Sequence, residues 1–363
     1  MDENMNNNTS KTIQELNDEN FQRLLGPTIF LIVMLIIGIP GNLTVLIIYG
    51  RKYTKSVYRT IVWNLAIADQ IFCTVGIPFN IARVVHYYSF QGEWTCVVFV
   101  VLLYLLLLYS THLLMLLSIH RFRKICMPLK SQLTVRNVNY WIVACLGISV
   151  VLSSPQFALS KFRRIDIGYN LTGTTCAISL SNPSIYHTVF SYGFLSLFVL
   201  YTLVLIFIYS MIGRQMYLQT HRRNEMNGNG IRSSISSKMT KIAFAISLVF
   251  ALSYIPVFVL QTTRKMIAEE ELSIGAFSFL KIAERLYVVN HVVNPFIYGI
   301  FDNQFKQHFK ELVTFNCPIW SSRQSTESTK PSLPKSSTNG SISTTSMDTC
   351  ESSVSFNEIR ENS

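Results

Sequence analysis

The chain has 363 residues, of which 49% are hydrophobic, a mean hydropathy of +0.32 and a formal net charge of +11. These values exclude an ordinary soluble domain, because the hydrophobic residues are collected in blocks of roughly 20 to 28, the length that crosses a bilayer. Nucleic-acid binding is also disfavoured, because most of the positive charge lies in the short polar breaks between those blocks.

The segment 1–26 is polar and is expected to lie outside the cell. It lacks an apolar stretch followed by a cleavage site, so we expect no cleavable signal peptide and expect the first span to direct insertion. Asn7 or Asn8 in this segment, and Asn170 in a later outer loop, form sequons for glycosylation.

Seven apolar stretches predict seven membrane-spanning helices. They cover residues 27–50, 60–87, 96–122, 139–160, 186–213, 239–263 and 274–301. The fourth and the seventh are the least uniform, and the seventh contains Glu284 and Arg285. The predicted fold is an all-α bundle of seven transmembrane helices over residues 27–301, with the two termini on opposite sides of the membrane.

Lys and Arg residues gather in the breaks after the first, third and fifth spans, as at Arg51, Lys124 and Arg222. Because such breaks stay in the cytoplasm, we expect an extracellular amino terminus, a cytoplasmic carboxyl terminus and a place in the plasma membrane. Cys96, at the start of the third span, and Cys176, after the fourth, then both face the oxidising side. We predict a disulfide between them, which ties that loop to the top of a helix.

The third span ends in Arg121, and a basic segment broken by Pro128 follows. An arginine at the end of a membrane span is costly unless it reaches water or meets a partner, so its placement indicates a functional role. The alternative is a basic flank that stops the helix at the cytoplasmic surface.

Residues 302–316 carry apolar side chains on one face and lysines on another, which predicts an amphipathic helix on the inner leaflet. Cys317 follows it and is a candidate for palmitoylation. Residues 317–363 are rich in Ser and Thr and nearly devoid of aromatic residues, so we expect a disordered cytoplasmic tail.

Short motifs occur once in almost every span. They are Gly41 and Asn42 in the first, Asn64 to Asp69 in the second, Trp94 to Cys96 before the third, Arg121 to Leu129 after it, Trp141 in the fourth, Phe250 to Pro256 in the sixth and Asn294 to Tyr298 in the seventh. In this order and spacing the chain resembles the rhodopsin-like (class A) G-protein-coupled receptors over roughly residues 27–313. In overall character it is most similar to neuropeptide receptors such as the cholecystokinin, orexin and galanin groups.

The resemblance implies two sets of functional residues. One is a sodium pocket that favours the inactive state, made of Asp69, Ser110, Asn290 and Asn294. The alternative for this set is a hydrogen-bonded packing network without an ion. The other set couples the receptor to its G protein; its tyrosines are expected to swing toward Arg121 and its prolines to act as hinges. Its members are His120, Arg121, Phe122, Pro128, Leu129, Tyr209, Phe250, Tyr254, Pro256, Asn294, Pro295 and Tyr298.

Several residues depart from the family pattern. His120 replaces the acidic residue before Arg121, and the sixth span offers Ser236 and Lys238 where a carboxylate could hold that arginine. Tyr254 replaces the sixth-span tryptophan, and Tyr201 replaces the fifth-span proline. We therefore expect a less restrained Arg121 and signalling without ligand, unless packing around the two tyrosines compensates.

The residues expected to contact a ligand are Arg83, Leu103, Arg163, Arg164, Arg264 and Glu284. Leu103 stands where amine receptors carry an aspartate, and Val288 stands where opsins carry the retinal lysine, so both ligand classes are disfavoured. Glu284 needs a partner within its span, and Arg285 is expected to point elsewhere. A cavity that offers charges of both signs among aromatic residues is expected to bind a peptide.

The leading hypothesis is a peptide receptor that activates heterotrimeric G proteins and meets arrestin and receptor kinases through its tail. A receptor for a lipid or another non-amine small molecule is the alternative within the family. A transporter or channel is a different-class alternative, but few charges lie inside the spans. An enzyme is not expected, because the sequence shows no nucleophile–base pair, metal cluster or phosphate-binding loop, and no cofactor is expected beyond a sodium ion.

Overall fold

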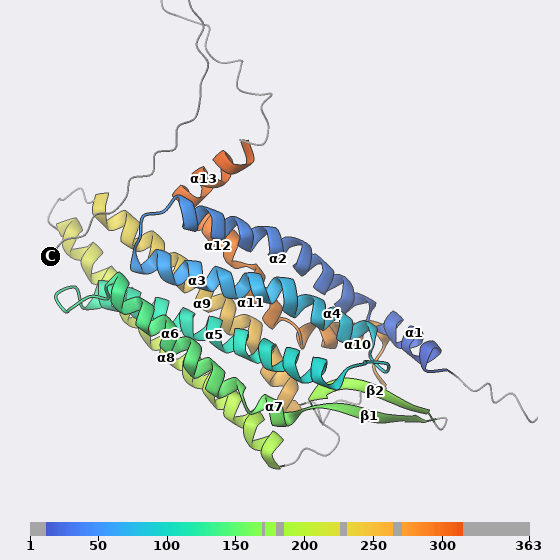
Figure 1. Ribbon diagram of the computed structural model, residues 1–363. Coiled ribbons are helices and arrows are strands. Elements are labelled where there is room, and N and C mark those ends of the chain that lie inside the picture. The colour runs from blue at the N-terminus through green and yellow to red at the C-terminus, as the bar shows by residue number, and fades with distance from the viewer. Residues whose placement is uncertain (1–11, 169–170, 179–184, 226–230, 264–270, 315–363) are drawn as a thin grey trace, which may run out of the picture. The chain divides into compact units, whose positions relative to one another are not determined.

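The computed structural model describes residues 12–168, 171–178, 185–225, 231–263 and 271–314, and they form a bundle of long helices (Figure 1). Six helical segments in this part of the chain are long and apolar enough to cross a membrane: Leu25–Arg51, Val57–Val85, Glu93–Cys126, Val135–Leu159, Thr188–His221 and Lys238–Thr263. A seventh, shorter apolar helix is Ile274–Ala283. The predicted all-α membrane bundle is confirmed.

The elements follow one another in a simple order. The first half contains α1 (Ile13–Arg23), α2 (Leu25–Arg51), α3 (Val57–Ile71), the π-helix η1 (Phe72–Gly76), α4 (Ile77–Val85), α5 (Glu93–Cys126), α6 (Val135–Ser153) and α7 (Gln156–Leu159). The second half contains β1 (Ser160–Gly168), β2 (Leu171–Ile178), α8 (Ile185–Glu225), α9 (Ile231–Thr263), α10 (Ile274–Ala283), α11 (Tyr287–Val292), α12 (Asn294–Phe301) and α13 (Asn303–Thr314). Helices α8 and α9 extend beyond the predicted spans 186–213 and 239–263.

Helix α1 was not predicted within the amino-terminal segment. Its first turn is closed by a capping box, in which Thr12 Oγ1 accepts from the Glu15 amide and Glu15 accepts from the Thr12 amide. Asn17 anchors the helix to the turn before α5, since it donates to Ser89 Oγ at 2.8 Å and accepts from the Tyr88 amide. The Thr12 and Glu15 spacing is the sequence signal that locates this helix.

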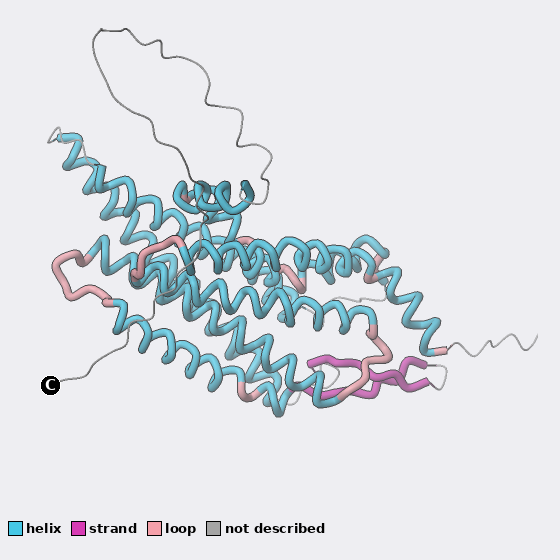
Figure 2. Tube along the Cα trace, turned by 45° about the horizontal axis from the view of Figure 1, so that its top comes forward, coloured by secondary structure: helices cyan, strands magenta, loops and turns pink. Residues whose placement is uncertain are grey.

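An antiparallel hairpin of β1 and β2 lies at one end of the bundle, the end that also carries α1 (Figure 2). Cys96 at the start of α5 forms the predicted disulfide with Cys176 on β2. Thr174 adds two backbone hydrogen bonds, to Tyr88 and Phe90, next to the disulfide. The hairpin is therefore fixed to the bundle by the disulfide and by several hydrogen bonds, and we call this the disulfide end.

The seventh segment is interrupted twice. A turn at 284–286 separates α10 from α11, and a bend at Val293 separates α11 from α12. Pro295 lies in the first turn of α12, where the missing amide hydrogen is not needed. The predicted kink at Pro295 is thus a break between two short helices, whereas Pro256 lies inside the continuous helix α9.

Asp302 lies immediately before α13, and its Oδ1 accepts from the Gln304 and Phe305 amides in the first turn of that helix. The other carboxylate oxygen accepts from Tyr53 at 2.6 Å and Tyr49 at 3.1 Å. Burial and the hydrogen bond to Asp302 raise the pKa of Tyr53 well above its ordinary value. This cluster joins α13 to α2 at the end of the bundle opposite the hairpin, which we call the Arg121 end.

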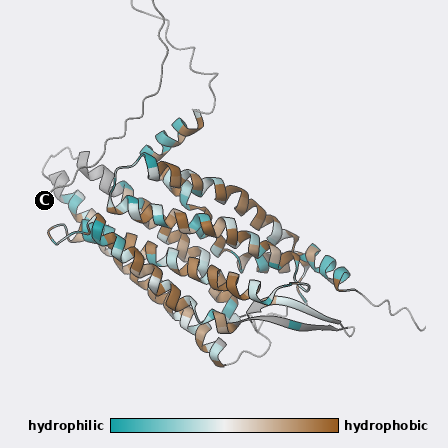
Figure 3. Cartoon of the chain, in the orientation of Figure 1, coloured by the Kyte–Doolittle hydropathy of each residue, from teal (hydrophilic) through white to brown (hydrophobic). Residues whose placement is uncertain are grey.

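Apolar residues predominate along the middle of the bundle, whereas polar residues gather at its ends (Figure 3). Ile36, Val143 and Leu203 are 65%, 68% and 58% exposed. An apolar belt of this extent is stable against lipid and not against water. The chain is therefore a multi-pass membrane protein.

Candidate functional site

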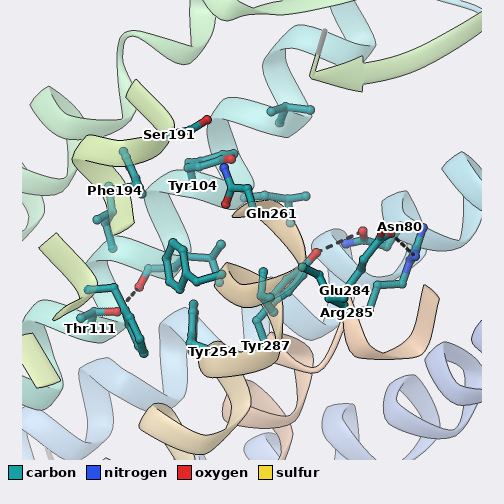
Figure 4. Close-up of a pocket in the computed structure, with 18 of the residues that line it drawn as sticks. Asn80, Tyr104, Thr111, Ser191, Phe194, Tyr254, Gln261, Glu284, Arg285 and Tyr287 are labelled. Atoms are coloured by element: carbon teal, nitrogen blue, oxygen red, sulfur yellow. Dashed lines mark hydrogen bonds and ion pairs between the residues drawn. The ribbon is translucent and has the colours of Figure 1, made fainter. Parts of the chain in front are cut away.

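A cavity of about 460 Å³ opens between the helices near the disulfide end. Its walls come from α4, α5, α8, α9, α10 and the turn before α11, with Cys176 of β2 at its rim (Figure 4). This volume lies within the range of cavities that bind small ligands or the end of a peptide.

Aromatic rings form one side of the cavity. Phe198 of α8 stacks on Phe258, with the ring centroids 4.6 Å apart, and on Tyr254 at 6.1 Å. Phe194 packs edge-on against Tyr104 at 5.3 Å. The Tyr254 hydroxyl is buried and has no hydrogen-bond partner among the described residues, so it can donate to a ligand.

Charged side chains form the opposite side. Glu284 accepts from Lys281 Nζ at 3.2 Å, and its second oxygen lies 3.7 Å from Arg285 Nη1. Arg83 of α4 donates through Nε to the Cys176 carbonyl at 3.1 Å, and no carboxylate in the described part of the chain pairs with it. Two of these three cations, Lys281 and Arg285, thus contact the one carboxylate, and Figure 4 shows Glu284 and Arg285 together on this side.

Only some of the residues predicted to contact the ligand line the cavity. Arg83, Leu103 and Glu284 line the cavity. Arg164 is exposed on β1 and does not line it, while the Arg163 side chain and Arg264 lie outside the described residues.

One expectation about this wall is wrong. Arg285 does not point away from Glu284, because the turn at 284–286 brings the neighbouring side chains together. Lys281, one helical turn before Glu284, was not predicted, although a lysine spaced i, i+3 from a glutamate in an apolar span is a readable signal.

A polar centre lies in the middle of the bundle around Asp69, whose side chain is completely buried. Asn294 Nδ2 donates to its Oδ2 at 2.6 Å, and Ser110 Oγ lies 3.4 Å from its Oδ1. His291 Nδ1 contacts the same Oδ1 at 2.7 Å. Asn290 is buried beside this histidine but makes none of the contacts to Asp69.

The sequence did not predict a contact between His291 and Asp69, because Asn290, Asn294 and Tyr298, spaced i, i+4 and i+8, were expected to form the polar face of this helix. A histidine within a membrane span three residues before Asn294 was the available signal, since ionisable groups at this depth need a partner.

Arg121 is 1% exposed at the opposite end of the cavity's helices. Its Nη2 donates to Met239 Sδ at 3.4 Å, and its Cζ lies 4.5 Å from the centroid of the Tyr58 ring. Nε and Nη1 have no hydrogen-bond partner, and no described carboxylate forms an ion pair with this guanidinium. His120, also buried, contributes no hydrogen bond through Nδ1.

None of the other predicted switch residues forms a hydrogen bond with this arginine in the described part of the chain. Tyr209 hydrogen bonds with Ser118 at 3.0 Å and Ser247 at 3.1 Å. The buried Tyr298 ring packs 5.4 Å from that of Tyr49. Phe122 packs on α8, Phe250 lies in the core, and Pro128 and Leu129 form the turn after α5, with Leu129 exposed.

His112 is a second histidine that sequence reasoning missed. Its Nδ1 contacts Ser149 Oγ at 2.8 Å and its Nε2 contacts Tyr201 Oη at 2.7 Å, so α5, α6 and α8 are joined at one imidazole. Tyr201 is the residue at the expected fifth-span proline position. The departure from the family pattern therefore replaces a backbone kink with a hydrogen bond between helices.

The predicted modification sites lie outside the described residues: Asn7, Asn8, Asn170 and Cys317.

The comparison with known proteins agrees with this arrangement. Residues 41–298 match the family described as "7 transmembrane receptor (rhodopsin family)". The chain is 27% identical over 318 residues to the type-1 angiotensin II receptor A of Xenopus laevis, with 83% of each chain covered. It is 26% identical to the neuropeptide Y receptor type 2 of Sus scrofa, covering 78% of this chain and 74% of that one. It is also 26% identical to the somatostatin receptor type 5 of Bos taurus, covering 84% and 80%.

Proposed function

Because the chain belongs to the rhodopsin family of seven-transmembrane receptors, we propose that it is a plasma-membrane receptor that couples an extracellular peptide to heterotrimeric G proteins. The family consists of receptors and not of enzymes. The proposal puts the disulfide end outside the cell and the Arg121 end inside, in agreement with the basic residues near the Arg121 end.

The observation that carries the proposal is the cavity, with aromatic rings on one side and charges on the other. The relatives are named for peptide ligands, namely angiotensin II, neuropeptide Y and somatostatin. A peptide end supplies both an apolar side chain for the Phe198 side and a charged or polar group for the Arg83 side.

The charged side chains in the cavity narrow the class of peptide that it can bind. Lys281 and Arg285 both contact Glu284, whereas no carboxylate in the described part of the chain pairs with the Arg83 guanidinium. A partly buried cation without a carboxylate partner favours an anionic ligand, and a guanidinium binds a carboxylate through two parallel hydrogen bonds. The preferred ligand is therefore a peptide that presents a free carboxylate next to an aromatic or aliphatic side chain.

At the inner end, Arg121 and its neighbours on α5, α8 and α9 form the surface proposed to bind the G protein. Helix α13 exposes Phe309 and Val313 and also carries Lys306 and Lys310, which suits a helix lying on the inner leaflet. The tail beyond it is proposed to meet receptor kinases and arrestin, and Cys317 to carry a lipid.

The test is a screen of synthetic peptides, each made with a free carboxyl end and with an amide, on cells expressing the receptor and a promiscuous G protein. We expect responses to acid forms that weaken at least tenfold for the matched amide and for the Arg83→Gln variant. Arg164→Gln, an exposed arginine away from the cavity, is the control and should respond normally. Equal responses to acid and amide would contradict the carboxylate preference, and responses to lipids alone would favour the small-molecule receptor.

A further inference from the structure

The imidazole of His291 contacts the carboxylate at which a sodium ion was expected. Its Nδ1 lies 2.7 Å from Asp69 Oδ1, and both side chains are completely buried. Asn290, the residue expected to contribute an oxygen to the ion, lies beside His291 without touching Asp69.

The ring is held in place from several sides. The Phe72 ring at the start of η1 stacks on it, with centroids 3.9 Å apart and planes 21° from parallel. The backbone carbonyl of His291 accepts from Asn42 Nδ2 at 2.8 Å, which fixes α11 against α2. Because the stacked ring and the hydrogen-bonded backbone both restrain it, the imidazole cannot leave Asp69 without moving its neighbours.

The remaining contacts of Asp69 also have the wrong polarity for a cation. Asn294 offers its amide nitrogen, so its oxygen, which a cation would bind, is not the atom directed at Asp69. Ser110 adds a hydroxyl donor at 3.4 Å. A carboxylate has about four lone-pair positions, and donors point at three of them, whereas a hard cation requires several oxygen ligands together. The residues present do not fit a sodium ion.

We propose that the His291 imidazole takes the place of that ion beside Asp69. The balance between the inactive and active states of this receptor then does not depend on sodium. One N–H donated by Nδ1 is sufficient for the contact, whether or not the ring carries a charge. Removing the ring should open space beside Asp69 and restore a site for sodium. The inference does not depend on the identity of the ligand.

The experiment measures the midpoint of thermal unfolding of the purified full-length receptor in NaCl and in choline chloride at equal ionic strength. The unmodified chain should unfold at the same temperature in both salts. His291→Ser should unfold at a higher temperature in NaCl, by a margin that grows with the logarithm of the sodium concentration. His308→Ser, a histidine on α13 away from the core, is the matched control and should show no difference between salts.

Two results would overturn the proposal. One is a sodium-specific rise in the unmodified chain that Asp69→Asn abolishes, since the ion would then bind despite the imidazole. The other is a folded His291→Ser variant with no sodium-specific rise. If His291→Ser is not recovered as a folded protein, His291→Asn, which keeps a donor but removes ring volume, is tested in the same way with the same criteria.

Discussion

The guanidinium of Arg121 lies over the ring of Tyr58, with Cζ 4.5 Å from the ring centroid. In this buried site the ring compensates part of the positive charge, because no described carboxylate pairs with the guanidinium. A cation over an aromatic face in a desolvated site gains about 2 kcal/mol. Tyr58 on α3 thus partly replaces the acidic neighbour that His120 does not supply.

Removing the Tyr58 ring should release Arg121. We expect Tyr58→Leu to raise ligand-independent signalling several-fold, since a change of ~1 kcal/mol shifts a two-state population by that factor. Tyr58→Phe keeps the ring and should retain the original level. Basal second-messenger production at matched surface expression measures both, and equal levels in the two variants would contradict the role of the ring.

Restoring an acidic neighbour should have the opposite effect. His120→Asp places a carboxylate beside Arg121, with a Coulomb attraction of about 1–4 kcal/mol depending on the local dielectric. We expect lower basal signalling and a largely intact maximal response, whereas Arg121→Ala should impair coupling altogether. Unchanged basal signalling in His120→Asp would show that the missing carboxylate does not set the resting state.

The disulfide should determine whether the cavity entrance forms. Cys96→Ser or Cys176→Ser removes the covalent link between β2 and α5 and leaves the hairpin held to the bundle by non-covalent contacts alone. Loss of a natural disulfide costs about 2–5 kcal/mol in small soluble domains. We expect reduced surface expression by antibody labelling of intact cells for both variants. Cys73→Ser, at a free thiol, is a control for substitution alone, and normal expression of both disulfide variants would argue against the bridge as a structural element.

The His112 contact should stabilise the bundle. Tyr201→Phe removes the hydroxyl and leaves Nε2 of a buried imidazole without a partner, which costs about 1–3 kcal/mol. We expect a lower midpoint of thermal unfolding in the purified receptor. Tyr140→Phe removes a hydroxyl from an exposed tyrosine and should leave the midpoint unchanged. Equal midpoints in the two variants would mean that the hydrogen bond contributes nothing measurable.

The tail should affect desensitisation and not G-protein activation. Phosphates added to its Ser and Thr residues would give a flexible chain the negative charge that a basic arrestin surface binds. A chain truncated after Cys317 should signal normally and internalise more slowly after stimulation. Internalisation at the normal rate, measured by loss of surface label, would refute the role of the tail.

The sequence by itself determined the class of protein. The thickness of a bilayer fixes the length of an apolar span, so the hydrophobic blocks located the helices without any knowledge of their packing. One motif per span was sufficient to indicate the rhodopsin family, and Cys96 and Cys176 were correctly paired. The absence of an acidic residue next to Arg121 was likewise readable in the chain.

The tertiary structure alone decided which side chains meet. His291, and not Asn290, contacts Asp69, although residues three and four positions before Asn294 both lie near its face of a helix. Helical periodicity therefore leaves both residues possible, whereas contacts with distant residues hold His291 in place: the Phe72 ring stacks on its imidazole and Asn42 donates to its carbonyl. The turn at 284–286 also brings Arg285 back to Glu284. The sequence therefore determined what kind of molecule this is, and packing between helices determined which residue occupies its polar centre.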